Sequence, residues 1–186
     1  VGRSVGPHGI AAVFSAFPIQ IVVMAFALLL GSGGVSLISR SLGARDVDRA
    51  ERALGTITSV SLILGTIMAW VIIIFADPLV RALGASESIV HDSIAYVRIV
   101  GLPIPAFCYS IVSNNAARGE GNARLAMVTM LISGLMNVFL DALLIFNLGM
   151  GVVGAAWATA VSQTLGAVWL AWYYLSGKSV LRLRAD

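Results

Sequence analysis

The sequence predicts an all-α membrane protein, a polytopic bundle of five transmembrane helices. Of its 186 residues, 59% are hydrophobic and only 11% are charged, whereas a soluble domain has about 25% charged residues. The apolar residues also gather in uncharged windows, and a helix needs about 20 such residues to cross a bilayer. These windows cover residues 9–39, 53–76, 99–117, 125–140 and 142–177.

The windows and the turn signals between them define five spans. A Gly-containing turn at residues 147–151 (Asn-Leu-Gly-Met-Gly) separates the last two helices. The predicted spans are residues 10–38, 54–76, 94–116, 125–146 and 152–175. Pro103 and Pro105 lie inside the third span. Because proline lacks a backbone donor and clashes with the preceding turn, we expect a kink there.

Three polar segments connect the spans. Residues 39–53 are charged and read as a loop, with a turn of surface helix from about Asp46, where an acid interacts favourably with the helix dipole. In the link 77–93, Asp77 and Pro78 predict the N-cap and first residue of a short helix. The Gly-rich segment 117–124 predicts a tight turn.

The distribution of Lys and Arg predicts the orientation. Segments 39–53 and 117–124 and the C-terminal tail hold nine of these residues, against three on the other side. Since cytoplasmic loops are enriched in positive charge, we place those segments in the cytoplasm and expect a multi-pass protein of the inner (plasma) membrane. The nine are Arg40, Arg45, Arg49, Arg52, Arg118, Arg124, Lys178, Arg182 and Arg184; the three are Arg3, Arg81 and Arg98. Because this bias accounts for the net charge of +3, no nucleic-acid partner is expected.

Asp141 is the strongest functional candidate, because an acid at the centre of a membrane helix costs roughly 2.5–3.5 kcal/mol and marks a functional site by default. Asn137 and Ser133 lie four and eight residues earlier, on the same helix face. A rise of about 1.5 Å per residue places Asp141 about 7–8 Å and Thr159 about 10 Å from the outer ends of their spans. Tyr96 lies nearer the outer surface. Asp141, Asn137, Thr159 and Tyr96 are therefore expected in the outer half of the bilayer.

Each of these residues also has a structural interpretation. Asp141 could reach water at its helix end or pair with Arg98. Asn137 could join two helices, a contact worth about 0.6 kcal/mol in membranes. The Thr159 hydroxyl could bond its own helix. Tyr96 could belong to an interfacial aromatic belt.

Gln163, Ser133, Pro103 and Pro105 are candidates to line a cavity. The first lies one turn beyond Thr159, and the prolines free backbone groups that water can satisfy. The two histidines are isolated in sequence, and no set of residues suited to hydrolysis is present. We therefore expect no enzyme activity, no cofactor, and no metal unless Na⁺ binds at Asp141.

Four stretches make the chain resemble the multidrug and toxic compound extrusion (MATE) family, in the branch named after DNA-damage-inducible protein F. They are residues 39–44 (Ser-Arg-Ser-Leu-Gly-Ala), 118–124 (Arg-Gly-Glu-Gly-Asn-Ala-Arg), 136–141 (Met-Asn-Val-Phe-Leu-Asp) and 148–159 (Leu-Gly-Met-Gly-Val-Val-Gly-Ala-Ala-Trp-Ala-Thr). Each stretch is weak alone, but their order and spacing are specific.

The resemblance implies a twelve-helix antiporter built from two six-helix lobes. This chain would supply helices two to six of the N-terminal lobe, so the first helix and the C-terminal lobe are expected outside it. In that branch an Asn and an Asp on the fifth helix, a Thr on the sixth and a Tyr on the fourth surround a proton or sodium site. They match Asn137, Asp141, Thr159 and Tyr96.

The implied function is ion-coupled antiport, with H⁺ or Na⁺ driving export of amphipathic or cationic organic compounds across the lipid bilayer. One alternative is a lipid-linked oligosaccharide flippase of the same superfamily. Such proteins tend to carry several Arg and Lys in the cavity, and here none lies deep within a span. The other alternative is a structural membrane fragment that does not transport.

Overall fold

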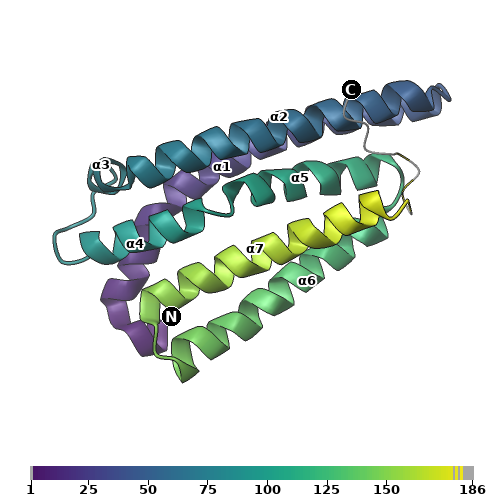
Figure 1. Ribbon diagram of the computed structural model, residues 1–186. Helices are drawn as coiled ribbons and strands as arrows, with labels where there is room; N and C mark the ends of the chain where they lie inside the picture. The colour runs from purple at the N-terminus through teal and green to yellow at the C-terminus, as the bar shows by residue number, and fades with distance from the viewer. Residues whose placement is uncertain (1, 178, 180, 182–186) are drawn as a thin grey trace.

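The computed structural model describes residues 2–177, 179 and 181, and its regular structure there is helical (Figure 1). This confirms the predicted fold class. Lys178, Arg182 and Arg184, used above for orientation, and the side chain of Arg3 lie outside the described residues. The elements are α1 (Gly2–Gly43), α2 (Val47–Ile74), α3 (Ala76–Ala82), α4 (Val90–Gly101), α5 (Ile104–Gly119), α6 (Ala123–Asp141), the π-helical turn η1 (Ala142–Asn147) and α7 (Gly151–Leu175).

The long helices form a bundle with α4 and α5 in its middle. The second half of α1 packs with α2 along one edge, its first half passes α4 and reaches α7, and α6 and α7 pack together along the other edge (Figure 1). Helix α5 contacts both pairs, and α4 contacts α1 and α7. A polar side chain on α4 or α5 can therefore meet groups from either edge of the bundle.

Among the described residues, four helices are long and apolar enough to cross a membrane, and α4 and α5 pass the same test together as a broken span or a re-entrant loop. The two helices of that pair are bent by 51°. Leu102 and Pro103 lie between them. Since Pro103 and Pro105 have no backbone N–H, the helical hydrogen-bond ladder fails at this point. The predicted kink in the third span is confirmed.

The connection between the first two spans is more helical than predicted. Helix α1 continues to Gly43 and α2 begins at Val47, so the prediction of a loop is wrong for residues 39–43, whereas the helix predicted from about Asp46 is present. Charged residues such as Arg and Glu favour helices as well as loops, which is why charge alone misled the prediction. The expected helix start is confirmed, because Asp46 Oδ1 accepts a hydrogen bond of 3.0 Å from the backbone of Arg49.

The link between the second and third spans contains the short helix α3. Its N-cap is Phe75, so the prediction that Asp77 caps it is wrong. Asp77 instead accepts a hydrogen bond of 2.9 Å from Arg81, which also pairs with Glu87. The hydrogen bond with Glu87, and then that with Asp77, raise the pKa of the Arg81 guanidinium.

Small residues bring α7 close to its neighbours. A Cβ at Gly154 would lie 3.1 Å from the carbonyl of Leu144 in η1, and a Cβ at Gly166 would overlap the hydroxyl of Ser133 in α6. Such positions let membrane helices approach closely. The contact at Gly154 fixes the start of α7 against η1, next to Asp141.

Candidate functional site

Side chains from α1, α6 and α7 interact with Tyr96, in the middle of α4. Tyr96 is only 5% exposed. Its hydroxyl makes side-chain hydrogen-bond contacts with Gln20 of α1 and Thr159 of α7, and it interacts electrostatically with Asp141 at the end of α6. An interfacial belt tyrosine would face the membrane surface. The burial of Tyr96 instead places it within a polar site.

Thr159 fits both of its sequence interpretations. Its hydroxyl donates a hydrogen bond of 3.0 Å to the carbonyl of Ala155, one turn earlier on α7. A hydroxyl oxygen still has lone pairs to accept with after its proton is used. Thr159 can therefore bond its own helix and offer an oxygen to Tyr96 or to a cation.

Asp141 is half-buried, and its Oδ1 atom is buried without a hydrogen-bond partner among the described residues. Arg98 is exposed, and in the described part of the chain no ion pair joins it to Asp141. A carboxylate oxygen removed from water without a partner is costly, so a proton or cation there would be stabilising.

The π-helical turn η1 follows Asp141 directly. Its wider winding shifts the backbone, as in the bond of 3.1 Å from the Leu148 N–H to the Leu143 carbonyl, five residues earlier. Single π turns occur frequently at functional sites. The helical pattern of the sequence did not signal this turn.

Asn137 lies one turn before Asp141 on α6 and is half-buried. It is not among the groups that contact Tyr96. The structure therefore brings together three of the four predicted site residues, and the role of Asn137 stays a prediction.

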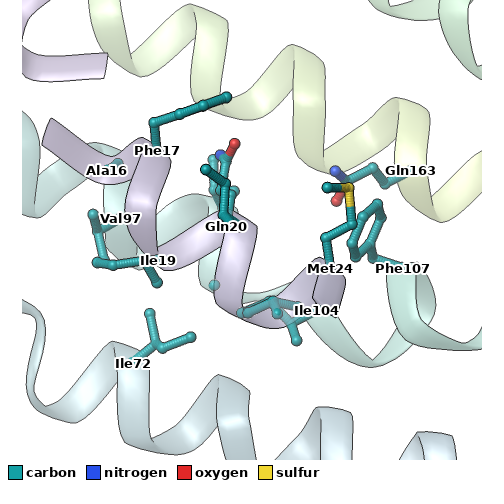
Figure 2. Close-up of a pocket in the computed structure, with 14 residues that line it drawn as sticks. Ala16, Phe17, Ile19, Gln20, Met24, Ile72, Val97, Ile104, Phe107 and Gln163 are labelled. Atoms are coloured by element: carbon teal, nitrogen blue, oxygen red, sulfur yellow. The ribbon is translucent and has the colours of Figure 1, made fainter. Parts of the chain in front are cut away.

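An apolar cavity of 280 Å³ lies beside this site, between α1, α2, α4, α5 and α7. Its polar side chains are Gln20 and Gln163, and Figure 2 shows Met24 and Phe107 beside the amide of Gln163. The residues that line it include no charged side chain. Gln20 thus belongs both to the cavity and to the group around Tyr96.

The other predicted cavity residues lie elsewhere. Pro103 lines a second cavity, of 260 Å³, between the α4–α5 break and α7. Pro105 packs against Gly65 of α2, where an added Cβ would lie 2.9 Å from its Cα. Ser133 lies at the contact of α6 with Gly166. Of the four, only Gln163 lines the cavity beside the Tyr96 site.

Gln20 is the site residue that sequence reasoning missed. It is a polar residue inside the first span, two positions after Pro18. That placement could have identified Gln20 as a candidate, because an uncharged amide in a membrane helix also needs a hydrogen-bond partner.

A membrane-spanning helical lobe with a polar site beside an apolar cavity is the arrangement of a polytopic membrane protein that binds ions or small molecules. The MatE family model matches residues 1–143. The chain therefore belongs to the MatE family, as its sequence predicted. The resemblance to one particular branch stays a prediction.

Curated relatives and solved structures agree with this assignment. The chain is 35% identical over 167 residues to the multidrug export protein MepA of Staphylococcus haemolyticus, covering 90% of this chain and 37% of MepA. It is 30% identical over 166 residues to the probable multidrug resistance protein YoeA of Bacillus subtilis, covering 87% of this chain and 36% of YoeA. It superposes with a TM-score of 0.93 and 33% identity on an outward-facing multidrug resistance MATE family transporter of the MOP superfamily, covering 98% of this chain and 41% of that one. The chain thus spans little more than a third of the length of these curated relatives.

Proposed function

We propose that this chain forms the ion-binding part of a secondary active transporter, in which H⁺ or Na⁺ entry drives export of amphipathic or cationic organic compounds. The observation that supports this most directly is the Oδ1 of Asp141, which is buried without a partner among the described residues and belongs to a carboxyl group that interacts electrostatically with Tyr96, itself in contact with Thr159. These three groups offer the oxygen ligands that a proton or a sodium ion binds.

Coupling requires that the ion favours one conformation over the other. Binding of one cation at Asp141 neutralises its charge and removes the cost of keeping it among apolar helices. The conformation that closes the site from water is then favoured only when the ion is bound. Because Gln20 contacts Tyr96 and lines the cavity, a change at the ion site reaches the substrate site through one side chain.

The 280 Å³ cavity is the observation that favours an organic substrate. Its volume is close to the lower end of the range of about 300–1,000 Å³ for ligand pockets, and an apolar lining with a few placed polar groups is typical of them. The amides of Gln20 and Gln163 can orient a polar group while Met24 and Phe107 contact an apolar one. The lining offers no positive charge to the phosphates of a lipid-linked oligosaccharide, which disfavours the flippase.

We further propose that residues 39–53, residues 117–124 and the C-terminus face the cytoplasm of a cell whose inner membrane holds the protein. The α1–α2 and α5–α6 turns lie at one end of the bundle, and α3 and the η1–α7 turn lie at the other (Figure 1). The first end holds Arg40, Arg45, Arg49, Arg52, Arg118 and Arg124. Positive charge therefore gathers at the proposed cytoplasmic end.

The test is transport by the full-length protein in proteoliposomes, with an imposed H⁺ or Na⁺ gradient and a fluorescent cationic substrate. Asp141→Asn keeps the shape of the side chain and removes its charge, so we expect gradient-driven export to be lost. Asp92→Asn is the matched control, because Asp92 is exposed in the first turn of α4. Gradient-driven export by Asp141→Asn at the wild-type rate would contradict the proposal.

A further inference from the structure

Four side chains of α5 have polar atoms that are buried between the cavity and the end of the helix at Gly119, the proposed cytoplasmic end. The Tyr109, Ser110 and Ser113 hydroxyls and the Asn114 Oδ1 atom have no hydrogen-bond partner among the described residues. Tyr109 is 7% exposed and Ser113 is 1% exposed. At a rise of about 1.5 Å per residue, they lie about 7–15 Å from the end of α5 at Gly119, in the inner half of a bilayer.

Two of these side chains continue the face of α5 that lines the cavity. Ser110 and Asn114 follow Phe107 at three and seven residues, and such positions share one helix face. Phe107 lines the cavity together with Gln163. The polar row thus begins where the cavity ends and runs toward the cytoplasmic end of the bundle.

The other two side chains face α7 and connect to the cytoplasmic surface. The Tyr109 and Ser113 hydroxyls interact, but their geometry does not form a standard hydrogen bond. The Ser113 carbonyl accepts a hydrogen bond of 3.2 Å from the Tyr174 hydroxyl, which also interacts with Glu120. Glu120 caps the end of α5 and accepts a hydrogen bond of 2.7 Å from Ser179.

Buried polar atoms at membrane depth require a partner, and a buried water molecule commonly makes two to four hydrogen bonds to such atoms. We propose that α5 and α7 hold a buried water site at Tyr109, Ser110, Ser113 and Asn114, and that this site conducts the coupling proton between Asp141 and the cytoplasmic surface at Glu120. The second half of the proposal rests on the proposed function, with H⁺ as the coupling ion.

The proton transfer is a relay. The Asp141 carboxylic acid gives its proton to a water molecule, which leaves a carboxylate and a hydronium ion. Each water or hydroxyl along α5 then accepts one proton and releases another, and the last passes to the Glu120 carboxylate or to cytoplasmic water. Among the described residues, the ionisable side chains that interact along this route are Tyr109 and Glu120 at α5 and Tyr173 and Tyr174 on α7.

The water site can be tested without transport. Radiolytic hydroxyl-radical footprinting of the full-length protein in nanodiscs labels buried side chains that touch water. We expect Tyr109 to be modified at least about tenfold faster, after correction for intrinsic reactivity, than Leu170. Leu170 is fully buried in the same apolar cluster and serves as the dry control. Equal protection of Tyr109 and Leu170 would overturn the water site.

The relay is tested by hydroxyl removal. In the variant with Tyr109→Phe and Ser113→Ala together, we expect export driven by a proton gradient to slow about tenfold, with the substrate KM unchanged. Ser61→Ala is the matched control and should keep the wild-type rate, because the buried Ser61 hydroxyl bonds its own helix at the Thr58 carbonyl, 2.8 Å away. Thermal unfolding of each purified variant separates a slow transporter from an unfolded one.

A double variant that is folded and exports at the wild-type rate would overturn the relay. If the export rate of the wild type does not change when a proton gradient is imposed, both the relay and H⁺ as the coupling ion of the proposed function are overturned. The rate at which hydroxyl radicals modify Tyr109 would still show, independently of transport, whether water is present at this site.

Discussion

Three hydroxyls of helix α2 and the side chains around Tyr96 differ in where their polar partners lie. On α2, the hydroxyls of Thr56, Ser61 and Thr66 donate to carbonyls of their own helix at 2.8, 2.8 and 2.7 Å. Around Tyr96, side chains from four helices interact, and one oxygen of Asp141 has no partner among the described residues. A hydroxyl that donates to a carbonyl of its own helix needs no partner from another helix. Polar groups that meet between helices keep oxygen atoms free to bind an ion. Substitutions at the Tyr96 site should therefore reduce ion binding without changing α2.

Among variants that keep Asp141, the largest expected effect is that of Tyr96→Phe, which removes the hydroxyl that contacts Gln20 and Thr159 and interacts electrostatically with Asp141. Hydrogen bonds to charged groups are worth about 1.5–3 kcal/mol, so the affinity for the coupling ion should fall by about 10- to 100-fold. The measurement is the ion concentration that gives half-maximal transport in proteoliposomes. An unchanged value would show that Tyr96 takes no part in ion binding.

Gly166→Ala should reduce stability, because the added Cβ would overlap the Ser133 hydroxyl across the α6–α7 contact. Overpacking costs about 1–3 kcal/mol, which should lower the midpoint of thermal unfolding. Adding Ser133→Ala removes the overlap and should restore most of the loss. If the second substitution restores nothing, the close approach of α6 and α7 at this point is wrong.

Gln163→Leu should affect the substrate rather than the ion. It removes one of the two amides of the cavity at similar volume, and a hydrogen bond is worth about 1 kcal/mol, so KM should rise about fivefold. The dependence on the ion gradient should stay as in the wild type. A changed ion dependence with an unchanged KM would reverse the roles given to the cavity and to the Tyr96 site.

The smallest effect is expected for Thr66→Val on α2. Thr66 is exposed and bonds only its own helix among the described residues, so stability should change by less than about 0.5 kcal/mol. Ion and substrate affinities should not change. A loss of ion affinity comparable to that of Tyr96→Phe would remove the distinction between the two regions.

Spacing along the chain predicted much of this site. The rise of a helix and the position of each turn set the depths of Asp141, Thr159 and Tyr96, and the structure brings these three together. Prolines with no backbone donor predicted the break between α4 and α5.

Features that depend on the rotation of a helix were not predicted. Helix α1 is apolar on most of its exposed sides, so the sequence did not show that Gln20 faces Tyr96. The π-helical turn after Asp141 depends on local packing against α7 and leaves no periodic signal. The helical end of α1 at residues 39–43 was missed because charged residues favour both helices and loops.

The central claim is that Asp141 holds the coupling ion, and proton release on substrate binding tests it most directly. The full-length protein, purified in weakly buffered detergent solution with a pH indicator, would be mixed with a cationic substrate. If H⁺ is the ion, linkage predicts release of about one proton per bound substrate by the wild type and none by Asp141→Asn. If Na⁺ is the ion, substrate affinity should fall with added Na⁺ in the wild type only. If the wild type and Asp141→Asn release equal numbers of protons, or if their substrate affinities respond equally to Na⁺, the claim that Asp141 holds the coupling ion is contradicted.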